Sequence, residues 1–213
     1  SQRHHQINEI FLGWMMTNYN CFKRLSLFGA ALALCVVVLG AYVRLSDAGL
    51  GCPDWPGCYG ALTVPQSEAA IQKAQEIFPH SAIETGKAWK EMAHRYLAGT
   101  LGMVVLAICA FGWRSKPYIK VSPLLPGALL LIIAFQAALG MWTVTMLLKP
   151  AIVSAHLIGG MTTLALLTWI AYRHWSTNDA LLAITPKLKL AIRGAIVVLL
   201  AQVFLGGWTS TNY

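Results

Sequence analysis

A glutamate and a histidine stand three positions apart in the segment Glu91-Met-Ala-His94-Arg95, at the start of a long apolar stretch. Residues at i and i+3 share one face of a helix, so the carboxylate and the imidazole would be neighbours. Ionisable groups are costly inside an apolar segment and are therefore candidates for function. The Glu91 carboxylate could accept a proton, bind a ligand group, or pair with Arg95 or Lys87.

A second histidine is predicted at the same depth on another helix. His156 lies six residues past Pro150, and His94 lies seven residues past Lys87. If both helices enter the membrane from one side, the helical rise places both imidazoles roughly 10 Å below that surface. Two histidines at one level can ligate a haem iron between the helices of a bundle. A lone buried histidine is more often a hydrogen-bonded core residue, but the matched depth favours haem ligation.

Two arginines flank the predicted haem level. Arg44 and Arg95 lie near the same ends of their apolar segments. A guanidinium there can hold the propionates of a haem through paired hydrogen bonds. The alternative is that both side chains simply extend to the membrane interface.

Two cysteines close a short loop, Cys52-Pro-Asp-Trp-Pro-Gly-Cys58. Its prolines and Gly57 favour turns, and the loop is predicted to lie on an oxidising side of the membrane. We therefore expect a disulfide, which would contribute roughly 2 kcal/mol in the chain-entropy model. Zinc would need two further ligands, and only His80 is available in the loop. Packing thiols are expected for Cys21, Cys35 and Cys109.

Apolar segments of membrane-spanning length position these residues. Of the 213 residues, 57% are hydrophobic and 11% are charged, and the mean hydropathy is +0.59, values outside the range of soluble globular proteins. Five segments are long enough to cross a bilayer: Leu25–Val43, Tyr96–Trp113, Leu124–Leu148, Ala151–Tyr172 and one beginning near Leu190. We predict an all-α, polytopic transmembrane protein in which the first four segments form a four-helix bundle.

The basic residues indicate topology. The net charge is +8, but the basic residues lie between apolar segments and form no surface stripe, which argues against a nucleic-acid partner. The N-terminal segment and the loops after the second and fourth apolar segments carry ten Lys and Arg against two acids, whereas the other connections carry six against six. Basic loops stay in the cytoplasm, so the N-terminus is predicted to be cytoplasmic.

These patterns predict a division of the chain into four parts: a cytoplasmic segment 1–24, the bundle 25–174 with an outer loop 46–90, a cytoplasmic linker 175–189, and a fifth helix 190–213. Residues 1–24 could be a helix on the membrane surface or an unstructured leader.

Two short features are predicted between the long helices. In the outer loop, Ser67 begins a short helix that Pro79 ends, and we expect that helix to lie across the bundle as a lid. Leu147–Pro150 predicts a tight hairpin between antiparallel helices.

A weak internal repeat links three of the helices. The motif Gln136–Thr143 recurs as Gln202–Thr209, with a fainter copy at Leu39–Tyr42. Repeated halves often form the substrate site of a membrane protein between them. Because the chain ends at Tyr213, where the fifth helix would reach the outer surface, we expect a missing second half.

Three motifs occur in order along the chain: Arg44-Leu-Ser-Asp-Ala-Gly-Leu-Gly-Cys52-Pro-Asp-Trp-Pro-Gly-Cys58, then Glu91-Met-Ala-His94-Arg95, then His156. Together they resemble the haem A synthase family of cytochrome oxidase assembly proteins. Members of that family look like two pseudo-symmetric four-helix halves. The resemblance implies that this chain is the N-terminal half, plus the first helix of the second half, of an eight-helix protein.

The resemblance also implies a reaction, the oxidation of a methyl group of haem O to the formyl group of haem A. It implies that His94 and His156 are axial ligands of the haem iron, that Glu91 is a catalytic carboxylate, and that Cys52 and Cys58 form the disulfide of the outer loop. The haem would be either haem O as substrate or haem b as cofactor, and we assign this half to the substrate.

The implied surroundings are a bacterial inner membrane, an enzyme that supplies haem O, and cytochrome oxidase maturation factors, with a homo-oligomer left open. One rival is a bis-histidine b-type cytochrome that passes electrons to or from quinone, which would give Glu91 and the cysteine loop no task. A second rival is a transporter or assembly scaffold without a cofactor.

Overall fold

The protein is all-helical in a computed structural model, which describes residues 2–122, 124–176 and 185–212. Its elements are α1 (Gln2–Leu45), α2 (Glu68–Ile77), α3 (Thr85–Arg114), the 3-10 turn η1 (Lys116–Tyr118), α4 (Leu125–Thr145), α5 (Pro150–Trp175) and α6 (Pro186–Asn212). All but α2 and η1 are long and apolar enough to span a membrane. The prediction of a polytopic helical membrane protein is confirmed.

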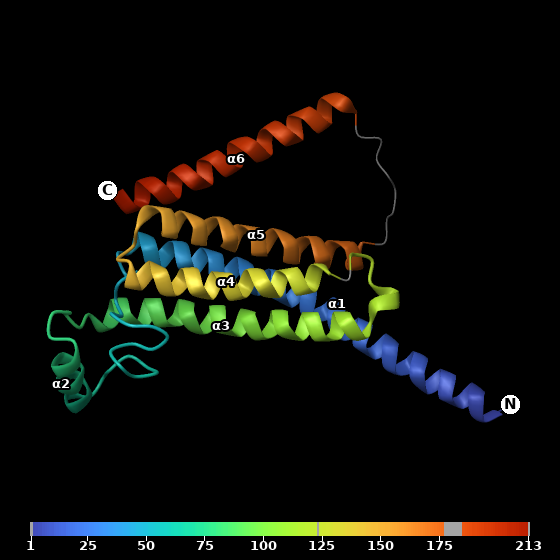
Figure 1. Ribbon diagram of the computed structural model, residues 1–213, viewed down its shortest axis with the longest axis horizontal. Helices are drawn as coiled ribbons and strands as arrows, with labels where there is room; N and C mark the ends of the chain where they lie inside the picture. The colour runs from blue at the N-terminus through green and yellow to red at the C-terminus, as the bar shows by residue number, and fades with distance from the viewer. Residues whose placement is uncertain (1, 123, 177–184, 213) are drawn as a thin grey trace.

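Four helices form the bundle and a fifth lies beside it (Figure 1). α1 packs against α3 and α5, and α4 packs against the same two helices from the other side. α6 packs against α5 and diverges from it along its length (Figure 1). We call the end of the bundle that carries residues 46–84 the loop end, and the opposite end, next to η1, the far end.

The helices extend beyond the predicted apolar segments. α1 is continuous from Gln2, without a break at residue 24, and its first turns project past the far end (Figure 1). The backbone of residues 2–24 is therefore helical and not an unstructured leader. α3 begins at Thr85, inside the predicted outer loop 46–90. Hydropathy marks where a helix becomes apolar, but polar residues continue it until proline or a turn intervenes.

The last predicted boundary lies only partly within the described residues. α6 begins at Pro186, ahead of the predicted start at residue 190. Of the predicted linker 175–189, residues 177–184 lie outside the described residues.

Large apolar side chains fill the bundle toward the far end. One buried cluster joins α1, α3, α4 and α5, and its members are Phe22, Ala33, Leu101, Val105, Ile108, Leu129, Leu167 and Ile170. A second buried cluster lies at the loop end, where the loop meets α2 and α3, and its members are Cys52, Cys58, Tyr59, Val64, Ala74, Ala88 and Met92. The interior near the histidines lies between these two clusters.

The short helix α2 begins as predicted but lies elsewhere. Ser67 caps it, because its Oγ accepts a hydrogen bond from the Ala70 N–H at 3.2 Å. We predicted a lid across the bundle; instead α2 lies beside the first turns of α3 (Figure 1). Its apolar face, through Ala74, joins the loop-end cluster with Tyr59 and Ala88. Burial of Ala74 in that cluster holds α2 against α3 rather than over the bundle.

Candidate functional site

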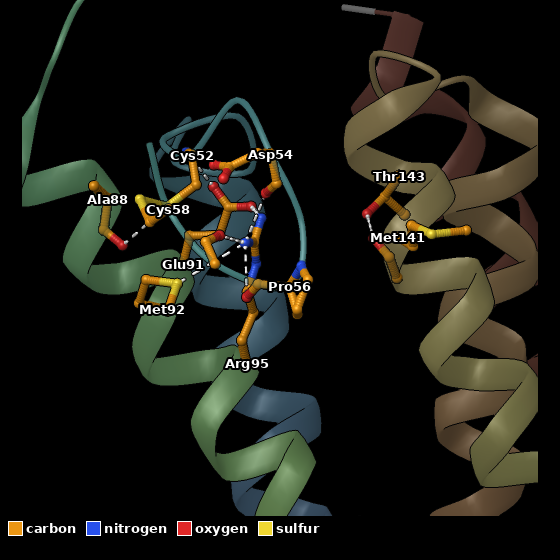
Figure 2. A network of polar contacts seen from close by, with 12 residues as sticks. Cys52, Asp54, Pro56, Cys58, Ala88, Glu91, Met92, Arg95, Met141 and Thr143 are labelled. Atoms are coloured by element: carbon orange, nitrogen blue, oxygen red, sulfur yellow. Dashed lines mark hydrogen bonds and ion pairs between the residues drawn. A yellow bond between two sulfur atoms is a disulfide. The ribbon is translucent and has the colours of Figure 1, made fainter. Parts of the chain in front are cut away.

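Glu91 connects α3 to the cysteine loop. Its side chain is almost completely buried, with 4% of the residue exposed. Oε2 accepts a hydrogen bond from the Cys52 N–H at 2.8 Å, and Oε1 accepts one from Nη2 of Arg95, one turn further along the helix. Both carboxylate oxygens are therefore bound (Figure 2). Two donors at a buried carboxylate satisfy its charge.

Arg95 fixes the backbone of the same loop. Its Nη1 donates to the carbonyl oxygens of Asp54 at 2.9 Å, of Pro56 at 3.4 Å and of Gly57. In Figure 2 the guanidinium lies between Glu91 and the loop backbone. Arg95 was predicted to hold a haem propionate, and this role stays a prediction. In the structure its two terminal nitrogens bind the loop and Glu91.

The loop itself is closed by a disulfide between Cys52 and Cys58, whose Cα atoms are 4.8 Å apart. The chain turns back after Asp54. The Asp54 carboxylate holds this turn, because it accepts hydrogen bonds from the Tyr59 N–H at 2.6 Å and the Gly60 N–H at 2.8 Å. Tyr59 donates its hydroxyl to the Ala82 carbonyl at 2.8 Å. Burial raises the pKa of the Tyr59 phenol, and the negative charges of Glu84, Glu91 and Asp54 raise it further.

The two predicted ligand histidines come from α3 and α5. His94 and His156 are both partly exposed as residues. The Nδ1 atom of each ring is buried and makes no well-formed hydrogen bond among the described residues, although the His94 ring lies near the backbone of Val36 and the His156 ring near the backbone of Gln136. A buried polar atom without a partner is costly, so both rings are candidates for binding a group that the protein itself does not supply.

Glycines on the two neighbouring helices face these rings. A Cβ placed on Gly40 of α1 would lie 2.8 Å from Cε1 of His94, and one on Gly140 of α4 would lie 3.6 Å from Cε1 of His156. A side chain at position 40 would therefore displace the His94 ring. All four helices of the bundle contribute to this part of the interior, two with imidazoles and two with the glycines against which those rings lie.

Arg44 lies at the loop end of α1 and reaches α6. Its Nη2 donates to the carbonyl oxygen of Ser210, and its Nε is buried without a hydrogen-bond partner in the part of the chain that the structure describes. Arg44 thus connects the bundle to α6. Its predicted contact with a propionate stays a prediction, for which the Nε atom is the available donor.

Comparison with known proteins decides the family. The model of the cytochrome oxidase assembly protein family (COX15-CtaA) matches residues 23–213, which include every site residue described above. The chain belongs to this family. The heme A synthase of Shewanella oneidensis is 47% identical to it over 182 residues, or 84% of this chain and 54% of the relative.

More distant relatives of this family member carry the same name. The heme A synthase of Halalkalibacterium halodurans is 26% identical over 87% of this chain and 59% of its own length. That of Agrobacterium fabrum is 32% identical over 52% of this chain and 33% of its own length. The chain thus spans about half the length of these curated relatives. No solved structure matches it.

The structure brings a further polar residue to the site of this family member. Gln136, in the middle of α4, places its amide against Gly159 of α5, where an added Cβ would overlap the Gln136 Nε2. In the sequence, Gln136 stands out only as the first residue of a repeat. The signal that could have identified it is an amide in the middle of an apolar helix.

A histidine that the sequence did not single out has a structural role. His174, buried at the far end of α5, accepts a hydrogen bond at Nε2 from the Lys120 N–H at 3.0 Å. Its Nδ1 therefore carries the proton and donates to the Ile170 carbonyl at 2.7 Å. His174 fastens the loop after η1 to α5 and takes no part in the site.

Proposed function

We propose that this chain is the haem-binding part of a membrane haem A synthase, an oxidoreductase that converts a methyl group of haem O into the formyl group of haem A. His94 and His156 would be the axial ligands, Glu91 the catalytic carboxylate, and haem O the substrate held here. Three facts support this: membership of the cytochrome oxidase assembly family, the name shared by its relatives, and the geometry of the histidine pair.

The single observation that carries the proposal is the pair of imidazoles between α3 and α5. Each ring has a buried nitrogen that makes no well-formed hydrogen bond among the described residues, and each faces a glycine on the adjacent helix. The main buried apolar cluster of the bundle lies toward the far end. An apolar macrocycle with an iron that takes two nitrogen ligands fits such a site.

The histidines, Glu91 and its two hydrogen-bond donors would have different roles in the proposed reaction. A bound haem would supply the methyl group to be oxidised, and His94 and His156 would hold its iron. Glu91 would take up a proton at Oε1 or Oε2. The Cys52 N–H and the Arg95 guanidinium are positioning groups, which hold that carboxylate and balance its charge.

A binding experiment tests the histidine pair. We expect the purified protein to bind haem with the absorption spectrum of a bis-histidine complex, and His94→Ala or His156→Ala to abolish that spectrum. His80→Ala is the matched control, because His80 lies exposed in the loop. If both alanine variants kept the bis-histidine spectrum, the assignment of the ligands would be wrong.

A second experiment tests Glu91. Glu91→Gln should keep haem bound but stop the appearance of formyl-bearing haem in pigments extracted from membranes of expressing cells. Glu84→Gln is the control, because the Glu84 side chain is 58% exposed. Full activity of Glu91→Gln would remove Glu91 from the mechanism. Extraction of haem b alone from the wild type would favour the rival b-type cytochrome.

The orientation and surroundings belong to the same proposal. We place the protein in a bacterial inner membrane with its N-terminus in the cytoplasm, where it would receive haem O from the enzyme that makes it and act with oxidase maturation factors. The excess of basic residues at the far end supports this orientation. A membrane-impermeant thiol reagent should label Gln72→Cys on intact inner-membrane spheroplasts, and Lys116→Cys only after permeabilisation. The reverse pattern would invert the topology.

A further inference from the structure

Gln136 is a polar side chain at a depth where polar groups are rare. It lies in the middle of α4, and its amide makes no hydrogen bond with the described residues. An amide inside a membrane-spanning helix is a candidate functional group by default, because burying it without a partner is unfavourable. Gln136 is half-buried as a residue, and its amide can still bind a ligand group.

The position of this amide relative to the histidine is defined by two glycines. Gly140, four residues after Gln136 on the same face of α4, faces Cε1 of His156. Gly159, three residues after His156 on α5, leaves the notch that the Gln136 amide occupies. The amide therefore lies about 5 Å, one helical turn, further from the loop end than the His156 ring.

The charges of a haem set its orientation in the site. The two propionates of a haem lie on one edge, and because their charges are costly inside the bilayer, a bound haem would turn that edge to the loop end, where Arg44 has a buried Nε without a partner among the described residues. Its opposite edge would then point toward the far end and Gln136. In haem O that side of the macrocycle carries a hydroxyl-bearing alkyl tail, whereas haem b has a vinyl group there.

We infer that the Gln136 amide, held in the Gly159 notch, forms a hydrogen bond with the tail hydroxyl of haem O and so selects haem O over haem b. The inference rests on the proposed function and adds a specificity-determining residue to it. A site that hydrogen-bonds a ligand hydroxyl rejects the analogue that lacks it, because the buried amide is then left without a partner.

The test measures binding and not turnover. The 213-residue protein is titrated with haem O and with haem b in one detergent, and the ratio of the two dissociation constants is compared between variants. Gln136→Met, of similar shape, should reduce the preference for haem O about five- to tenfold relative to wild type, as expected for one buried hydrogen bond. Gly159→Ala keeps the amide but pushes it out of its notch, and should reduce the preference in the same direction.

Gln202→Met is the matched control, because Gln202 occupies the equivalent position of the repeat on the exposed face of α6. It should leave the ratio unchanged. An unchanged ratio in Gln136→Met, or equal weakening of both haems, would overturn the inference while leaving the histidine pair intact. Failure of the wild type to bind either haem would overturn the proposed function and this inference together.

Discussion

The two ends of the bundle are held together by different interactions. At the far end, Phe22, Ile108 and Ile170 are fully buried in an apolar cluster, and the one buried histidine there, among the described residues, has both ring nitrogens bound. At the loop end, a buried ion pair, a disulfide and backbone hydrogen bonds hold the loop to α3. Apolar packing therefore stabilises the far end, whereas polar and covalent contacts stabilise the loop end beside the histidines.

The largest expected effect is at the loop end. Arg95→Met would leave the buried Glu91 carboxylate without its charge partner, so we expect a loss of about 4 kcal/mol in the free energy of unfolding, measured by denaturation in detergent. Lys87→Met is the control on the same helix, because its partners Asp47 and Glu84 are exposed and such pairs contribute less than about 1 kcal/mol. If both variants lost the same free energy of unfolding, burial of the Arg95–Glu91 pair would not add to the stability of the protein.

The next effect is at the far end. Phe22→Ala should lower the free energy of unfolding by about 3 kcal/mol, because it leaves a cavity among close-packed side chains. Phe28→Ala, on the same helix but 53% exposed, should change it by much less. If Phe22→Ala were nearly neutral, the apolar cluster would not be what fixes this end.

The third-largest effect on the free energy of unfolding is expected from the disulfide. The double variant Cys52→Ser, Cys58→Ser should be less stable by roughly 2 kcal/mol, since the closed loop is short. Reducing agent should weaken the wild type by the same amount and have no further effect on the double variant. A response to reductant that persisted in the double variant would have to come from other cysteines.

The smallest effect depends on pH. Tyr59→Phe removes the hydrogen bond to the Ala82 carbonyl, at a cost of about 1 kcal/mol at neutral pH. Because the folded protein raises the pKa of Tyr59 above its ordinary value of 10.0, the associated stability is complete below that pH and is lost as the pH rises through the folded pKa.

An alkaline denaturation series tests this assignment. Wild type should lose stability above pH 10 faster than Tyr59→Phe, whereas Tyr42→Phe, on an exposed position of α1, should behave as the wild type. Identical alkaline curves for wild type and Tyr59→Phe would place the titrating group elsewhere.

Sequence alone could predict what depends on one segment at a time. The membrane helices follow from the composition of each apolar run, the start of α2 from the hydrogen bond that Ser67 can offer locally, and the hairpin after α4 from the short connection that ends at Pro150. These features depend on residues close together in the chain.

What sequence could not predict depends on residues far apart. No local pattern indicated that the Arg95 guanidinium also meets carbonyls from residue 54 onward, some forty residues earlier in the chain. The position of the Gln136 amide depends on its contact with Gly159, which lies on another helix. The position of α2 beside α3 followed from which apolar surface was nearest, and no local pattern contains that information.

His94 and Arg95 are consecutive residues of one rigid helix, and Arg95 is bonded to the loop that the disulfide closes. A shift of α3 at His94 would therefore be transmitted to that loop through Arg95. A spectroscopic label on the loop would report such a movement of the helix from outside the bundle.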